Sequence, residues 1–159
     1  MNGKTLAKAL LIQAAAVALV VIGYLAWDAD AIYEWLSGDI VFGAPAEASC
    51  DLNKEPCRAA LPDGTPVTLS ISPRPIPVMR KLQFEMRADA LKSDTVKLEM
   101  YGLNMNMGRY TYTLARGADG TFRGEGMIPS CVGQMQWRAN IIAETPMERV
   151  GTYFTFTTE

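Results

Sequence analysis

The pattern of apolar and polar residues changes once along this chain, near residue 50. Before that point, residues 9–27 form a nearly unbroken apolar run, in which Gln13 and Tyr24 are the polar exceptions. A helix of this length spans about 28 Å, close to the hydrocarbon thickness of a bilayer. The pattern therefore predicts a transmembrane helix at residues 9–27.

The charges that flank this run predict its orientation. Lys4 and Lys8 precede it, whereas the residues that follow are acidic, and basic flanks stay in the cytoplasm. We expect residues 1–8 in the cytoplasm and the rest outside. A cleaved signal peptide is the alternative, but the nearest Ala-x-Ala pattern, at residues 46–48, lies far beyond the apolar run. An uncleaved signal anchor in a bacterial inner membrane is the favoured interpretation.

Residues 28–49 connect the anchor to the rest of the chain. They carry acids and no base, and Ile32, Trp35 and Leu36 recur at helical spacing. The sequence predicts an acidic juxtamembrane helix followed by a linker that contains Gly43 and Pro45.

Beyond residue 50, apolar residues alternate with polar ones, which is typical of half-buried strands. Turn residues separate the runs, and no amphipathic helix lies between them. This predicts an all-β, periplasmic domain at residues 50–159, an antiparallel immunoglobulin-like sandwich of about seven strands, with Trp137 in its core. Residues 73–77 contain three prolines and are excluded from a central strand. The seven runs are 67–71, 82–86, 96–100, 110–114, 122–128, 135–141 and 151–158.

Composition excludes several classes of function. The formal net charge is −2 and no basic stripe is present, which argues against nucleic acid as a partner. The chain has no histidine, so the usual triads and imidazole bases are missing, and we expect no enzyme. Glu99 and Glu125 fall in the solvent-facing phase of their strands and are expected to be surface charges.

The methionines fall into two groups. Met86 and Met100 are in phase with core positions, whereas Met105 and Met107 lie in a loop bracketed by Gly102 and Gly108. Thioethers in an exposed loop are expected to be covered by a metal, by a partner or by packing of the loop itself. Thioether and thiol sulfurs are soft ligands, which suit Cu(I). The sequence predicts a Cu(I) site with Met105 and Met107 as primary ligands.

Two further sulfurs follow in the sequence, at Cys131 and Met135, and either could complete the copper shell. Met135 also shares the inward phase of Trp137, so a core position is the competing interpretation and the favoured one for this residue. Cys50 and Cys57 are close enough for a short disulfide loop, which would leave Cys131 as a free thiol. Pairing of Cys57 with Cys131 is the alternative, and the copper shell would then contain methionine alone.

Several of these residues together resemble a known family. The chain resembles bacterial membrane-anchored periplasmic proteins akin to the YtkA-like domain of FixH-type proteins, which are associated with Sco-type copper chaperones and cytochrome oxidase assembly. The resemblance implies an all-β fold and a role in copper delivery. It rests on Cys50 and Cys57, and on segments 72–78, 102–108, 124–126 and 129–137.

The function expected from the sequence is Cu(I) binding or copper delivery at the periplasmic face of the membrane. The expected partners are a respiratory haem–copper oxidase or a Sco-type chaperone. The alternative is a metal-free accessory or assembly subunit whose methionine loop docks on a membrane protein, since methionine surfaces also serve adaptable contacts.

Overall fold

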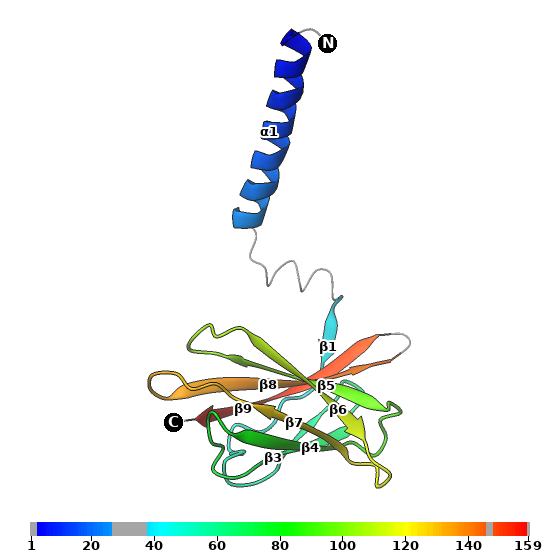
Figure 1. Cartoon of the computed structure of the whole chain (residues 1–159). Helices are drawn as coiled ribbons and strands as arrows, with labels where there is room; N and C mark the ends of the chain where they lie inside the picture. Colours follow the sequence, from blue (N-terminus) through cyan, green and yellow to red (C-terminus); the bar gives the residue numbers. More distant parts are fainter. Residues whose placement is uncertain (1–2, 27–37, 146–147, 159) are drawn as a thin grey trace. The chain divides into compact units, whose positions relative to one another are not determined.

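The computed structural model describes residues 3–26, 38–145 and 148–158 of the 159-residue chain (Figure 1). The chain divides into two compact units, Met1–Asp39 and Ile40–Glu159. Each unit is described by itself.

In the described part of the first unit, the chain forms one helix, α1, at Gly3–Ala26. Within it, Ala7–Tyr24 has a mean hydropathy of 1.9 and no buried residue, so by length and composition this helix could cross a membrane. The predicted helix at residues 9–27 is therefore present over its described part. The predicted juxtamembrane helix at residues 30–36 lies outside the described residues.

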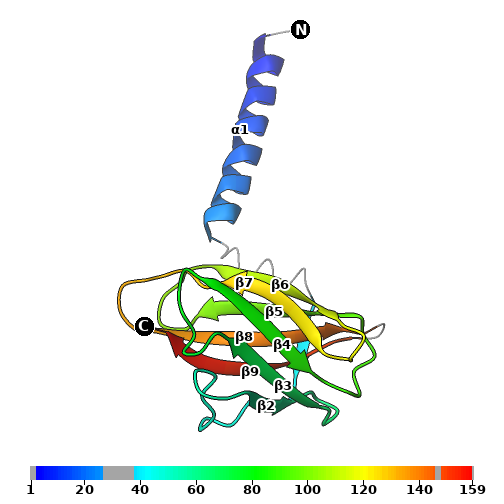
Figure 2. The same cartoon turned by 60° about the horizontal axis from the view of Figure 1, so that its bottom comes forward.

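Over its described residues, the second unit is a single curled sheet of nine strands in the order β1-β9-β8-β5-β6-β7-β4-β3-β2 (Figures 1 and 2). All neighbouring strands are antiparallel except β1 and β9, which are parallel. The strands are β1 Ile40–Phe42, β2 Cys57–Ala60, β3 Pro66–Ser72, β4 Lys81–Arg87, β5 Thr95–Gly102, β6 Arg109–Arg116, β7 Phe122–Met127, β8 Met135–Glu144 and β9 Arg149–Thr158.

The seven predicted strands are confirmed as β3 to β9, and the proline segment at residues 73–77 lies in the connection between β3 and β4. The structure adds β1 and β2, which have three and four residues. Strands this short contain too few residues for an alternation of apolar and polar side chains to be recognised in the sequence. The β domain is thus confirmed, but the seven-strand immunoglobulin-like sandwich needs correction, because all nine strands belong to one continuous curled sheet.

The pairing between neighbouring strands is shortest between β6 and β7, which share only two partner pairs, Ala115 with Arg123 and Arg116 with Phe122. Beyond these pairs, the Tyr112 hydroxyl donates a hydrogen bond to the Met127 carbonyl at 2.6 Å and so replaces part of the missing ladder. A Cβ at Gly126 would lie 2.5 Å from the Tyr112 ring. Glycine at this position therefore lets the ring lie over the strand.

Residues 43–46 connect the two edges of the sheet, where β1 and β2 lie. The Gly43 amide donates to the Gly151 carbonyl of β9 at 2.8 Å, and the Ala60 amide of β2 donates to the Ala44 carbonyl at 2.9 Å. The Thr152 hydroxyl donates to the same Ala44 carbonyl. The folded unit consequently begins at Ile40, inside the segment that the sequence indicated as a linker.

One hydrophobic cluster fills the inside of the curl. Its largest fully buried side chains are aromatic, and burial of each contributes roughly 1.5–3 kcal/mol. The Trp137 indole is fully buried as predicted, and its N–H donates to the Thr158 hydroxyl at 2.9 Å. Met86 and Met100 are also fully buried, which confirms that they belong to the core.

Glu99 corrects a second expectation, because it is only 5% exposed. Its carboxylate accepts hydrogen bonds from the Arg109 guanidinium at 3.1 Å and from the Asn140 amide at 3.3 Å. Arg109 lies over the ring of Tyr101, so long side chains from neighbouring strands cover the outer face here. The alternating pattern correctly assigned Glu99 to the outer face of the sheet. Glu99 is nevertheless buried, because long side chains from neighbouring strands cover this part of the outer face.

Candidate functional site

Two loops at one end of the sheet carry the sulfur residues singled out by the sequence. One joins β5 to β6 at residues 103–108, and the other joins β7 to β8 at residues 128–134 (Figure 1). They meet because β5 pairs with β8 along its length, up to the Gly102–Trp137 pair. The Leu103 amide extends this pairing by donating to the Gln136 carbonyl at 2.8 Å.

Asn104 holds the two loops together. Its side-chain nitrogen donates to the Gln134 carbonyl, and its side-chain oxygen accepts from the Gln136 amide, both at 3.0 Å. An amide side chain can satisfy a donor and an acceptor on one strand in this way. Sequence reasoning missed this role. The available signal was an asparagine in a glycine-bracketed loop, where its side chain can replace backbone pairing.

The sulfur of Cys131 lies 2.7 Å from the sulfur of Met105. Cys50 and Cys57 form the predicted disulfide, so Cys131 is a free thiol. Met105 is 41% exposed and Cys131 is half-buried, which places this contact at the surface. The pair offers one thioether and one thiol, both soft donors.

The other two candidate ligands have apolar surroundings. Met135 is 2% exposed and is part of the core, as the competing interpretation predicted. Its methyl group lies close to the backbone of Gly102, where an added Cβ would be 2.9 Å from it. Met107 is half-buried against the core, and its carbonyl accepts a hydrogen bond from the Tyr110 hydroxyl at 2.9 Å. Among the described residues, the hydrogen-bond partner of the Cys131 thiol is the sulfur of Met105.

More apolar side chains are exposed around the same loops. The Met79 amide donates to the Ile128 carbonyl at 2.8 Å, which joins the β3–β4 connection to the β7–β8 loop. Every exposed methionine of the described part of the chain belongs to this end of the sheet. The exposed apolar side chains here are Met79, Leu103, Met105, Met127 and Val132.

Over the described ranges, no group of three or more histidine, cysteine, aspartate or glutamate side chains could hold a metal ion. Zinc, calcium and magnesium sites normally use such groups. The donors that the fold brings together are the sulfurs of Met105 and Cys131.

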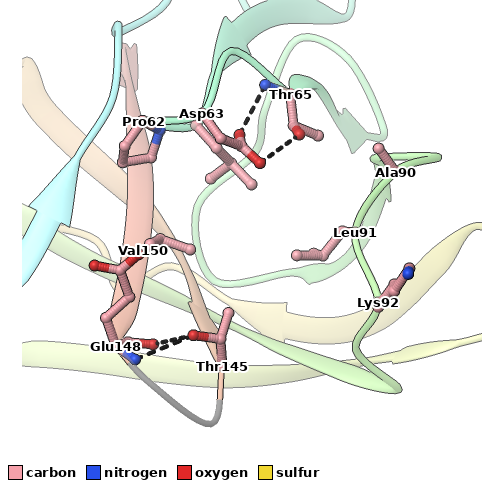
Figure 3. Close-up of a pocket in the computed structure, with 10 residues that line it drawn as sticks. Pro62, Asp63, Thr65, Ala90, Leu91, Lys92, Thr145, Glu148 and Val150 are labelled. Carbon is pink, nitrogen blue, oxygen red and sulfur yellow. Dashed lines mark hydrogen bonds between the residues drawn. The ribbon is translucent and has the colours of Figure 1, made fainter.

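A pocket of 250 Å³ lies at the other end of the sheet, among the loops before β3, β5 and β9 (Figure 3). The Asp63 carboxylate accepts from the amide and the hydroxyl of Thr65, both at 2.9 Å, and these bonds lower the pKa of Asp63. The Thr145 hydroxyl donates to the Glu148 carbonyl at 2.7 Å. These polar groups stabilise turns, so they are not directed toward a ligand.

The chain matches no protein-family model, no curated protein and no solved structure. The resemblance to FixH-type proteins therefore stays a prediction from the motifs of the sequence.

Proposed function

We propose that this protein is a membrane-anchored Cu(I)-binding protein whose β domain faces the periplasm. The observation that supports this most directly is the contact between the sulfurs of Cys131 and Met105 in two exposed loops. Met107, expected as a primary ligand from the sequence, becomes a secondary candidate because the Cys131 thiol contacts the sulfur of Met105 instead. Met135 is a secondary candidate because it is buried in the core.

The donor types favour Cu(I) over other metals. Thiolate and thioether are soft ligands, whereas Cu(II) and zinc sites usually recruit imidazole, and the chain has no histidine. Cys131 would bind the metal as a thiolate and release its proton to solvent. Met105 has no proton to lose and can bind at any pH.

The destination of the copper follows from the resemblance and the anchor. Helix α1 is long and apolar enough to hold the β domain at a bilayer surface. Lys4 and Lys8 favour a cytoplasmic N-terminus and hence a periplasmic domain. Delivery to a haem–copper oxidase, directly or through a Sco-type chaperone, is the role we propose for a copper protein at this position.

A metal-free docking role is the second candidate. It is supported by the exposure of Met79, Leu103, Met127 and Val132 around the sulfur pair. Exposed methionines adapt to many partner shapes, because the thioether side chain is flexible and polarizable. In this case the loops would bind a membrane protein and the sulfur contact would be incidental.

Anaerobic titration of the full-length protein against a chromophoric Cu(I) chelator separates the two functions. Met105→Leu and Cys131→Ser each remove one donor, and Met127→Leu is a matched control because it changes an exposed methionine nearby. We expect each donor variant to lose at least about tenfold in affinity, or about 1.4 kcal/mol, with the control unchanged. Unchanged affinity in both folded donor variants would reject the copper function and favour docking.

Oxidase assembly provides the cellular test. Strains that produce Met105→Leu or Cys131→Ser in place of the native chain should accumulate less copper-loaded oxidase, and added copper should restore part of it. Normal assembly with either variant, combined with lost copper binding in vitro, would reject delivery to the oxidase while leaving copper binding in place.

A further inference from the structure

The edge of β9 that faces away from β8 is covered in part by the chain itself. Along the described chain, three carbonyls on this edge accept a hydrogen bond from an amide elsewhere in the domain. The pairs are the Gly43 amide with Gly151 at 2.8 Å, the Ala46 amide with Tyr153 at 3.1 Å, and the Asn53 side-chain amide with Thr157 at 2.9 Å. The N–H and C=O of one strand residue point to the same edge and successive residues alternate, so the odd-numbered residues of β9 present their peptide groups here.

Thr155 belongs to this set and lies midway between Tyr153 and Thr157. Thr155 is exposed, and within the described part of the chain its peptide N–H and C=O have no hydrogen-bond partner. The four residues from Tyr153 to Thr157 span about 14 Å of strand. The cover of the edge is therefore interrupted over a length of about three residues, where an exposed N–H and C=O have the orientation that an added strand requires.

A groove of about 490 Å³ lies at this interruption, a volume typical of ligand sites. β9 contributes Thr155 and Thr157 to its lining, the connection between β1 and β2 contributes Cys50 and Asp51, and the β5–β6 loop contributes Leu103. The β1–β2 connection is held by the Cys50–Cys57 disulfide, and Asn53 joins it both to Thr157 and to the Ile76 amide. The groove is thus formed in advance of any ligand.

Asp51 gives the groove a negative charge. Its carboxylate accepts from the backbone amide of Asn53 at 3.0 Å, and this bond lowers the pKa of Asp51, which keeps the carboxylate ionised at neutral pH. Lys54 pairs with the carboxylate at 3.2 Å, but its side chain is 82% exposed and it does not line the groove. The charge therefore favours a basic group on a molecule that lies in the groove.

We propose that this groove binds a short extended peptide segment of another protein, with its backbone paired to Thr155 and a basic side chain beside Asp51. An amide of the segment donates to the Thr155 carbonyl, and a carbonyl of the segment accepts from the Thr155 amide. A second copy of this chain fits poorly, because its own β9 edge is covered by residues 43–46 and by Asn53 on either side of Thr155. Neither Met105 nor Cys131 lines the groove, so the inference does not rest on the copper function.

The probe that tests this is the tripeptide acetyl-Val-Lys-Val-amide, added to the ¹⁵N-labelled full-length protein in detergent micelles. We expect saturable changes in the amide signals of Thr155 and Thr157, together with slower hydrogen exchange at Thr155. Methylation of the lysine backbone nitrogen removes the donor to the Thr155 carbonyl, and acetyl-Val-Glu-Val-amide reverses the charge. Each altered peptide should bind at least about tenfold more weakly. These comparisons use the unchanged protein, so they do not depend on the folding of a variant.

Variants of the groove test the same contacts from the side of the protein. Thr155→Pro removes the N–H that faces the edge and leaves the pairing with β8 in place, so it should abolish binding. Thr155→Val keeps the peptide group and is the matched control, with binding retained. Asp51→Asn should remove the preference for the lysine peptide over the glutamate peptide.

Four results would overturn the proposal. They are the absence of saturable changes at Thr155, equal affinity for the N-methylated peptide, undiminished binding by a folded Thr155→Pro variant, and a dimer that protects the Thr155 amide as the protein concentration rises. The last result, measured by sedimentation and hydrogen exchange, would assign the edge to a second copy of the chain.

Discussion

The thiol of Cys131 contacts the thioether of Met105 across a sequence separation of 26 residues. The contact depends on the pairing of β5 with β8, because each residue belongs to a loop at the same end of these strands. Met105 is 41% exposed, whereas Cys131 is half-buried and packs against the hydrophobic cluster. The contact therefore depends both on that packing and on the hydrogen bonds that hold the two loops.

Asn104 should control the site without being a ligand. Asn104→Leu removes the bonds to Gln134 and Gln136, and we expect a loss of about 1–2 kcal/mol in the free energy of unfolding together with weaker Cu(I) binding. Asn106→Ala is the control, since it removes one bond inside the loop. Denaturant unfolding and the chelator titration measure both effects. A stable Asn104→Leu variant with native affinity would contradict this role.

Glu99 and Glu125 should differ in their contribution to stability, although the alternating pattern predicted that both are surface charges. Glu99→Ala leaves the Asn140 amide without its acceptor and should cost about 2 kcal/mol. Glu125 pairs with Lys81 at 2.7 Å at the surface, so Glu125→Ala should cost less than about 1 kcal/mol. Equal midpoints of chemical denaturation for the two variants would show that the Glu99 network contributes nothing beyond a surface pair.

Removal of the Cys50–Cys57 disulfide should destabilise the β domain by roughly 2–3 kcal/mol, because closure of the short loop restricts the unfolded chain. Replacement of both cysteines by alanine tests this, and Cys131→Ala serves as the control with little effect. Thiol titration of the unfolded, unreduced protein should find one free group. Peptide mapping that links Cys131 to either partner would contradict the pairing.

The Asp119–Arg123 pair should make the stability of the domain fall in acid. Hydrogen bonds from Arg123 and from the Thr121 amide hold the pKa of Asp119 well below its ordinary value of 3.8. A lowered folded-state pKa means that the stabilisation is present above 3.8 and is lost as the pH falls below it. Asp119→Asn should flatten the stability profile in that acid range. An unchanged profile, measured by thermal unfolding from pH 5 downward, would exclude a contribution from the pair.

The anchor should remain attached in the mature protein. Its apolar length and the lysines before it favour an uncleaved span over a signal peptide. Intact-mass measurement of the protein purified from membranes should find α1 present. A mature N-terminus near Ser49 or Cys50 would show that the anchor is removed.

The sequence by itself determined the local elements of this protein. Alternation over five or more residues located β3 to β9, because one buried face is enough to define a strand of that length. The same phase assigned Trp137, Met86 and Met100 to the core. The spacing of Cys50 and Cys57 indicated their disulfide, since a loop that short closes readily.

Only the tertiary structure decided what lies next to what. The strands β1 and β2 are too short to show a period, and they are strands because β9 and β3 satisfy their backbone groups. The single curled sheet depends on the short β6–β7 pairing. The alternation of apolar and polar residues shows which face of a strand is buried, but it does not show which strands pair. Likewise, Met105 and Met107 have the same parity and the same glycine brackets, but strand pairing brings Cys131 to Met105 and leaves Met107 against the core.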